Sequence, residues 1–233
     1  MSSVRHVIFD LDGTLVDSLP GIAWSVDAAL AACGASRRCP DLKALMGPPI
    51  RDILAEVSGV SGGAALDHLE SAFRASYDSS GWRFTRCQPG AREILGRLSA
   101  RGLSLSVVTN KPRGATARIL RELALDIFFS DVLCRDSRFP LFTSKAEMLI
   151  DLFERRDIRA STGLMVGDTL EDCLAAANAC LACAIVPHGY GARWDRLPPG
   201  CRTVSGWSEL EDLCGIAAFP PDLRASEEQH DRS

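Results

Sequence analysis

The chain has 233 residues, of which 46% are hydrophobic and 24% are charged. These proportions are ordinary for a globular protein, and the length suits one large domain or a core with a modest insertion. The formal net charge of −4 gives no reason to expect nucleic-acid binding. No apolar run is long enough to span a bilayer, and residues 1–6 lack the form of a signal peptide. We therefore expect no membrane association and a cytoplasmic location.

The nine cysteines are an odd number and are scattered along the chain. Several of them, such as Cys33, Cys134, Cys173 and Cys180, stand among apolar residues. This favours small buried thiols in a reducing compartment over a disulfide framework. Cys180 and Cys183 form a lone C-x-x-C pair without a second pair at zinc-site spacing. We therefore predict neither a metal site nor a redox role for this pair.

The first element is an apolar run, residues 7–9, which is typical of a buried parallel strand. Apolar residues then recur at helical spacing, and no strand pattern interrupts residues 17–86. The spacing predicts helices over residues 21–33, 40–45, 50–57 and 64–79. We therefore expect residues 17–86 to form a small helical insertion within a larger domain.

Helices and strands alternate from residue 89 onward. The predicted helices cover residues 89–101, 112–125, 144–155, 170–179 and 209–216, and the predicted strands cover 103–108, 131–134, 164–166, 182–186 and 203–204. This alternation predicts an α/β fold, a Rossmann-like parallel sheet covered by helices on both faces. The active site of such a sheet lies at the carboxyl ends of its strands. Residues 1–16 and 87–222 would form this core, and residues 223–233 a polar tail.

Two aspartates follow the first strand directly. Asp10 and Asp12 are two residues apart, so on an extended backbone both carboxylates point the same way. Gly13 allows a tight turn and a close approach of the backbone to a ligand. Two parallel carboxylates are costly unless a cation or a proton lies between them. The simpler alternative is a strand that ends in a solvated acidic turn.

Other polar side chains stand where later strands end or helices begin. Thr109 ends the strand over residues 103–108, so its hydroxyl could donate to a phosphate oxygen or cap the next helix. Lys145 begins a helix, where the helix dipole disfavours a positive charge unless an anion lies nearby. The alternative for Lys145 is a plain solvated lysine, and Lys111, beside Thr109, is the other candidate for an active-site lysine.

A second pair of acids follows the strand over residues 164–166. Asp168 and Asp172 are four residues apart, which lets both face one site across a helical turn. Together with Asp10 and Asp12 they supply hard oxygen ligands of the kind that suits Mg²⁺. The alternative is a helix N-terminus with acids favoured by the dipole.

Four stretches of the chain resemble the motifs of the haloacid dehalogenase-like (HAD) hydrolases. The D-L-D-G-T stretch at residues 10–14 is similar to the first motif, and the following L-V-D-S is similar to the phosphoglycolate phosphatase branch. Thr109, Lys145 and the G-D-T-L-E-D stretch at residues 167–172 resemble the second, third and fourth motifs. One departure is Ala146, which stands where many relatives place a proline.

The resemblance implies the HAD fold, with the insertion acting as a helical cap. It also implies a Mg²⁺-dependent phosphatase that hydrolyses a small phosphorylated metabolite, such as phosphoglycolate. Asp10 would attack phosphorus to form an aspartyl-phosphate, and Asp12 would act as general acid and then as general base. The implied metal ligands are Asp10, the backbone carbonyl of Asp12, and Asp168. Asp172 would hold metal-bound water or support Lys145, which would neutralise the nucleophile and the phosphate.

The remaining site residues would bind the substrate. Thr109, Asn110 and backbone N–H groups near Gly13 would hold the phosphoryl oxygens in a protein of this family. Arg51 lies in the G-P-P-I-R stretch, which resembles the specificity loop of the cap. Its guanidinium could reach a substrate anion or hydroxyl, or it could be a solvated arginine at a helix start.

The acid at residue 12 discriminates between activities within the family. Phosphatases and mutases carry Asp there, as this chain does, whereas dehalogenases and phosphonatases do not. A sugar phosphomutase, a nucleotidase and a pyrophosphatase remain alternatives, and a non-catalytic phospholigand-binding protein would require a broken motif. We expect a monomer or a homodimer, and the sequence does not identify the phosphate ester.

Overall fold

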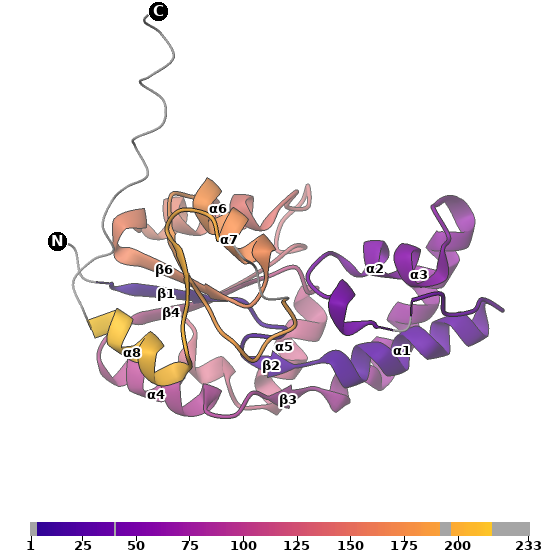
Figure 1. The fold of residues 1–233 in the computed structure, drawn as a ribbon, viewed down its shortest axis with the longest axis horizontal. Helices are drawn as coiled ribbons and strands as arrows, with labels where there is room; N and C mark the ends of the chain where they lie inside the picture. Colours follow the sequence, from indigo (N-terminus) through magenta and orange to yellow (C-terminus); the bar gives the residue numbers. More distant parts are fainter. Residues whose placement is uncertain (1–3, 40, 192–196, 216–233) are drawn as a thin grey trace, which may run out of the picture.

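A parallel sheet forms the larger part of the molecule. A computed structural model describes residues 4–39, 41–191 and 197–215, whose arrangement Figure 1 shows. The strands are β1 (His6–Phe9), β4 (Ser104–Thr109), β5 (Asp131–Cys134), β6 (Gly163–Gly167), β7 (Ala182–Ile185) and β8 (Cys201–Thr203). They pair in the order β5-β4-β1-β6-β7-β8, and each pairing is parallel. The expected α/β fold is confirmed.

Helices cover both faces of the sheet, because successive strand residues point to opposite sides. Val7 and Phe9 belong to the apolar cluster that α4 (Ala91–Ala100), α5 (Arg113–Glu122) and α8 (Trp207–Gly215) complete. Ile8 belongs to the cluster on the other face, with α6 (Lys145–Arg156) and α7 (Leu170–Asn178). Figure 1 shows α6 and α7 above the sheet and α4 and α8 below it.

A helical insertion leaves the sheet after β1 and returns before α4. It contains α1 (Leu19–Ala32), α2 (Ile50–Ser58) and α3 (Gly63–Ser79), which bury an apolar cluster together with Ala115 of α5. Two short strands, β2 (Val16–Asp17) and β3 (Arg86–Cys87), pair antiparallel where the chain enters and leaves. The insertion also contains the 3₁₀ turns η1 (Lys43–Leu45) and η2 (Gly81–Phe84), and the core contains η3 (Asp126–Phe128) and η4 (Ala160–Thr162). The insertion stands beside the sheet at the carboxyl ends of its central strands (Figure 1).

Two local expectations differ from the structure. The predicted helix over residues 40–45 is wrong, because within the described residues 41–45 only the single turn η1 forms. The Asp41 carboxylate accepts the N–H of Ala44 at 3.3 Å, which closes a local turn, and two prolines at residues 48 and 49 prevent a helix from continuing. Strands β2 and β3 were missed because two residues are too few to display an alternating pattern.

Some expectations concern residues outside the described part of the chain. The predicted polar tail, residues 223–233, lies outside it, as do residue 216 of the last predicted helix and residue 40. Within residues 4–39, 41–191 and 197–215, no helix has both the length and the hydropathy needed to cross a membrane.

Candidate active site

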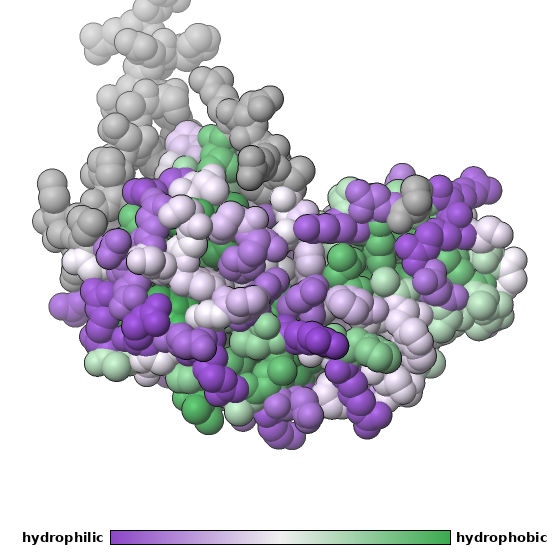
Figure 2. All heavy atoms as spheres, turned by 60° about the horizontal axis from the view of Figure 1, so that its bottom comes forward, coloured by the Kyte–Doolittle hydropathy of each residue, from purple (hydrophilic) through white to green (hydrophobic). Residues whose placement is uncertain are grey.

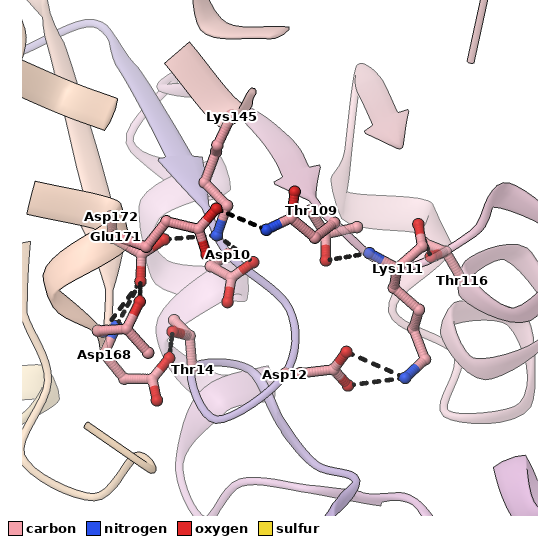
Figure 3. A network of polar contacts seen from close by, with 12 residues as sticks. Asp10, Asp12, Thr14, Thr109, Lys111, Thr116, Lys145, Asp168, Glu171 and Asp172 are labelled. Atoms are coloured by element: carbon pink, nitrogen blue, oxygen red, sulfur yellow. Dashed lines mark hydrogen bonds and ion pairs between the residues drawn. The ribbon is translucent and has the colours of Figure 1, made fainter. Parts of the chain in front are cut away.

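Four polar side chains meet at the carboxyl edge of the sheet because their strands are parallel neighbours. Asp10 follows β1, Thr109 ends β4 and Asp168 follows β6, so these three lie at the same edge. Lys145 is the first residue of α6 and reaches the same place from above in Figure 3. All four residues are at most 6% exposed, so their contacts are made away from bulk water.

Lys145 joins two carboxylates in a buried ion network. Its Nζ lies 3.1 Å from Oδ1 of Asp10 and 2.6 Å from Oδ1 of Asp172 (Figure 3). Burial by itself would lower the pKa of Lys145, but the attraction of the two carboxylates outweighs it and raises this pKa well above its usual value. These two acids provide the anionic neighbours that a lysine at a helix N-terminus requires.

The carboxylates of this network outnumber its lysine. Oxygens of Asp10, Asp168 and Asp172 lie within 4.8 Å of one another, and all three residues are buried. Burial raises the pKa of Asp10 well above its usual value, with further repulsion from the other acids. Burial also raises the pKa of Asp168 to about 7, and the negative charge of Asp172 adds to this. An additional cation at this cluster would relieve the repulsion.

Asp172 has little free capacity to accept further contacts. Its Oδ1 accepts from Lys145, and its Oδ2 accepts the N–H groups of Asp168 and Thr169 at 3.1 and 3.0 Å. The Thr169 hydroxyl also donates to Oδ2 at 2.8 Å, and the bond from the Thr169 N–H is one half of a capping box at the start of α7. Asp172 therefore fixes both Lys145 and the backbone turn that carries Asp168.

Asp12 lies apart from this network and pairs with the other lysine. The Nζ of Lys111 lies 3.0 Å from each oxygen of the Asp12 carboxylate (Figure 3). The same Nζ lies over the ring of Tyr77 in α3, 4.8 Å from its centroid. Burial would lower the pKa of Lys111, but Asp12 and Tyr77 raise it above its usual value. Lys111 thus connects the β1 loop to the helical insertion.

Thr109, Asn110 and Gly13 complete the set expected to bind the phosphate. The Thr109 hydroxyl accepts the N–H of Lys111 at 3.2 Å, and the Asn110 amide donates to Oε1 of Glu171 at 2.7 Å. Gly13 has a φ of +85°, and a Cβ atom built there would lie 2.3 Å from Oδ2 of Asp168. A side chain at position 13 would therefore displace Asp168.

A cavity of about 620 Å³ connects the sheet edge to the insertion. Its lining includes Asp10, Asp12, Thr109 and Lys145 from the core and Arg51 and Tyr77 from the insertion. Figure 2 shows the insertion as a smaller lobe beside the larger one, with hydrophilic and hydrophobic side chains interspersed on this face. A ligand in this cavity would contact both parts of the chain.

Arg51 is engaged by two acids of the insertion. Its Nη1 donates to Oε2 of Glu70 at 2.9 Å and its Nη2 to Oδ1 of Asp67 at 2.6 Å. Both acids belong to α3, and the Arg51 side chain is 40% exposed. It lines the cavity, but in this conformation its guanidinium connects α2 to α3.

Sequence reasoning missed two residues that hold Asp168. The Thr14 hydroxyl donates to Oδ1 of Asp168 at 2.9 Å, and the N–H of Tyr190 donates to Oδ2 at 2.7 Å. The Tyr190 hydroxyl donates to Oδ1 of Asp17 at 2.8 Å and accepts the N–H of Ser18 at 2.7 Å. Thr14 stands inside the first motif, and Tyr190 stands in the H-G-Y-G stretch at residues 188–191, which also resembles the phosphoglycolate phosphatase branch, but the sequence did not link either residue to Asp168.

Comparisons with known proteins agree with this geometry. The model of the haloacid dehalogenase-like hydrolase family matches residues 7–186. A phosphoglycolate phosphatase from Vibrio parahaemolyticus is 33% identical over 202 residues, which cover 80% of this chain and 85% of that protein. A 5′-nucleotidase from Pseudomonas aeruginosa is 32% identical over 190 residues, covering 80% and 84%. A haloacid dehalogenase-like hydrolase structure from Streptococcus pneumoniae superposes with a TM-score of 0.80, at 23% identity, over 91% of this chain and 99% of that one.

The structure thus defines an α/β protein whose parallel sheet carries a cluster of buried carboxylates at the carboxyl ends of its strands. The chain belongs to the haloacid dehalogenase-like hydrolase family. The resemblance that the four motifs indicated is confirmed, including the similarity to the phosphoglycolate phosphatase branch.

Proposed function

We propose that this chain is a Mg²⁺-dependent phosphatase that hydrolyses a small phosphorylated metabolite similar to phosphoglycolate. The observation that carries the proposal is the position of Asp10, which pairs with Lys145 at the wall of a cavity shared by core and insertion. A nucleophile of this kind needs a nearby cation, because an anionic phosphate would otherwise be repelled. The family membership and the relatives named phosphoglycolate phosphatase support the same activity.

The donor set at the sheet edge fits a divalent cation. Its buried carboxylate oxygens are hard ligands, and their negative charges exceed the positive charge of Lys145. Asp10, the backbone carbonyl of Asp12, and Asp168 would hold Mg²⁺. When bound, the ion would neutralise charge on the phosphoryl group beside the nucleophile. We assign Asp172 to holding Lys145, because its oxygens already accept four hydrogen bonds.

Asp10 and Asp12 would divide the chemistry between them. In the first step a carboxylate oxygen of Asp10 bonds to phosphorus as the bond to the leaving oxygen breaks, and Asp12 supplies the proton to that oxygen. In the second step Asp12 accepts a proton from the water that attacks the aspartyl-phosphate, which frees Asp10 and releases phosphate. The Thr109 hydroxyl and nearby N–H groups would hold the phosphoryl oxygens.

We further propose that residues 17–86 act as a cap that closes over the site. Most of the insertion's apolar cluster lies within the insertion itself, with Ala115 of α5 as its buried member from the core, and the insertion faces the core across the cavity. Tyr77 of α3 contacts Lys111, which in turn holds both oxygens of Asp12. The position of Asp12 would therefore depend on cap closure.

A nucleotidase is the second candidate. The Pseudomonas aeruginosa relative supports it, and a cavity of about 620 Å³ is large enough for a nucleoside monophosphate. We also propose a cytoplasmic location, which the nine free thiols support, since cytosolic proteins keep their cysteines reduced.

A phosphate-release assay tests the proposal. The purified chain with Mg²⁺ would be presented with phosphoglycolate, nucleoside monophosphates, sugar phosphates and pyrophosphate. We expect phosphoglycolate or a similarly small carboxylated ester to give a kcat/KM at least about tenfold above the others, a difference of about 1.4 kcal/mol in transition-state binding. A preference for nucleoside monophosphates would favour the second candidate, and no phosphate release from any ester would contradict both.

A further inference from the structure

Three cysteines from separate elements converge beneath α7. Cys173 lies in α7, Cys183 in β7 and Cys201 in the edge strand β8. Their sulfur atoms all lie within 4.8 Å of one another, and the Cys201 thiol also lies 3.7 Å from the carbonyl oxygen of Cys173. Cys173 and Cys183 are buried and Cys201 is partly exposed. The cluster thus has two enclosed thiols and one that solvent can reach.

Its surroundings differ from those of the carboxylate site. Cys173 and Cys183 belong to the apolar cluster between the sheet and α6–α7, and Cys201 packs against that cluster. Cys173 follows Asp172 in the chain, but the oxygens of Asp172 are taken by Lys145 and by the start of α7. The proposed phosphatase chemistry uses none of the three sulfurs.

The spacing of the sulfurs suits a single metal ion. Two sulfurs bound about 2.3 Å from one ion at a trigonal angle lie roughly 4 Å apart. The three sulfurs all lie within 4.8 Å of one another, which is compatible with this separation, so one ion could contact all three after small side-chain rotations. Thiolates select soft cations such as Cu(I) and Zn(II), whereas Mg²⁺ takes oxygen ligands. The two clusters are therefore suited to different metals.

We propose that Cys173, Cys183 and Cys201 form a binding site for one thiophilic d¹⁰ metal ion, Cu(I) or Zn(II). The partly exposed Cys201 provides the entry path. Three thiolates complete a trigonal site for Cu(I), and a water molecule on the Cys201 side would complete a tetrahedral site for Zn(II). The thiols release their protons when the metal binds, and no change of oxidation state is involved.

The bound ion would cross-link α7 to the edge of the sheet. Among the described residues, strand β8 pairs with a single neighbour, β7, through residues 201–203. A metal held by Cys173 as well as by the two strand cysteines adds a tie between β8 and α7. Because the metal binds the folded chain through all three ligands, it should raise the melting temperature by an amount that grows with the logarithm of the free metal concentration above Kd.

Cd²⁺ is the probe for the first experiment, because its thiolate complexes absorb in the ultraviolet. The full-length chain, reduced and freed of metal, would be titrated with Cd²⁺ in the presence of excess Mg²⁺, which occupies oxygen sites. We expect one Cd²⁺ per chain with a thiolate charge-transfer band. Bound Cd²⁺ is then displaced with Zn²⁺ and, in a separate experiment, with Cu(I) supplied from a buffering chelator. The concentrations required show which of the two physiological candidates binds more tightly.

Cys201→Ser is the test variant, because its side chain is partly exposed and the fold should tolerate the change. Cys180→Ser is the matched control: Cys180 is exposed and belongs to the C-x-x-C pair with Cys183, but it lies outside the cluster. We expect Cys201→Ser to bind Cd²⁺ at least about 10- to 100-fold more weakly and to lose the band, while Cys180→Ser matches the parent chain.

Two outcomes would overturn the proposal. The first is equal Cd²⁺ affinity in the parent chain and Cys201→Ser, which would make the cluster ordinary apolar packing. The second is a reduced chain that fails to hold Cd²⁺ and forms a Cys183–Cys201 disulfide in air, since these residues are register partners on β7 and β8. Cd²⁺ affinity and disulfide formation are both measured without phosphatase activity. Failure of the metal-site proposal can therefore be distinguished from failure of the proposed function.

Discussion

Replacing Lys145 with methionine would test the ion network at the centre of the site. Lys145→Met removes the positive charge between Asp10 and Asp172 but keeps a long, unbranched side chain that still fills the space. The two carboxylates are then left buried beside each other without their cation. We expect both stability and turnover to fall.

The contact distances set the size of the effect. At an effective dielectric constant of about 20, the contacts of 3.1 Å to Asp10 and 2.6 Å to Asp172 each correspond to roughly 5–6 kcal/mol of attraction before desolvation is counted. Breaking a buried pair typically costs about 3–5 kcal/mol net. For a chain of this size that corresponds to a decrease in melting temperature of about 6–20 °C. Loss of one charge-stabilising group should lower kcat by about 10²- to 10³-fold.

The assay combines thermal unfolding, with chelator and with Mg²⁺, and phosphate release. Lys111→Met is the matched control, because it removes a buried lysine of the same size from Asp12 instead of Asp10. The double variant Lys145→Met/Asp172→Asn should regain part of the stability, since it removes the second charge as well, but it should regain no activity.

The lysine assignment would be refuted by an active Lys145→Met variant with an unchanged melting temperature. It would also be refuted if Lys111→Met lost clearly more turnover than Lys145→Met, because Lys111 would then be the active-site lysine.

Four further predictions address the nucleophile, the metal, the cap and the pH dependence. Asp10→Asn keeps the size of the side chain but removes the attacking charge, so kcat should fall by several orders of magnitude, as on deletion of a covalent nucleophile; appreciable phosphate release would contradict this role. Chelation should abolish activity reversibly, and Asp168→Ala should raise the Mg²⁺ requirement or remove turnover; full activity in excess chelator would rule the metal out. Arg51→Ala should lower kcat/KM on the true substrate by about 10- to 100-fold, or about 1–3 kcal/mol, and leave a small aryl phosphate almost unaffected. Equal losses on both substrates would mean that its pairs with Asp67 and Glu70 serve the fold alone. In the metal-free chain burial raises the pKa of Asp168 to about 7, so the folded chain holds this proton more tightly than the unfolded chain. The melting temperature in chelator should therefore fall as the pH rises from about 4 through about 7, and Mg²⁺ or Asp168→Asn should flatten the profile; a chelated chain whose melting temperature rises across this range would oppose the reasoning.

The sequence by itself determined the sheet and the edge at which the site is built. The run from Val7 to Phe9 is apolar at every residue because both faces of its strand are covered. Parallel strands place their carboxyl ends at one edge, so residues that follow separate strands, such as Asp10, Thr109 and Asp168, meet there without further information. The sequence predicts these features because they depend on local periodicity and on the rule that parallel strands end at the same edge of a sheet.

Residues 40–45 show where local patterns fail. Apolar spacing predicted a helix there, but a side-chain-capped turn and the following prolines compete with it over so few residues. Short elements gain little from propagation of helical hydrogen bonds, so a single competing contact decides their conformation.

The resemblance to the family favoured Lys145 over Lys111 as the lysine beside the nucleophile, but only the tertiary structure shows which acid each lysine contacts. Lys111 and Lys145 both stand near motif residues, and a lysine side chain is long enough to reach several positions. Packing of α6 against the sheet directs Lys145 to Asp10, while the contact with Tyr77 of the insertion directs Lys111 to Asp12.

The cysteines show most clearly that the sequence does not determine by itself which side chains meet. In sequence, Cys180 and Cys183 form the visible pair, yet Cys180 is exposed and Cys183 lies with Cys173 and Cys201 instead. The register of β7 and β8 and the packing of α7 on the sheet bring these three cysteines together. Both depend on contacts between residues far apart in the chain. Periodicity along a sequence reports which face a residue occupies, but only the packing of one element on another determines which side chains meet.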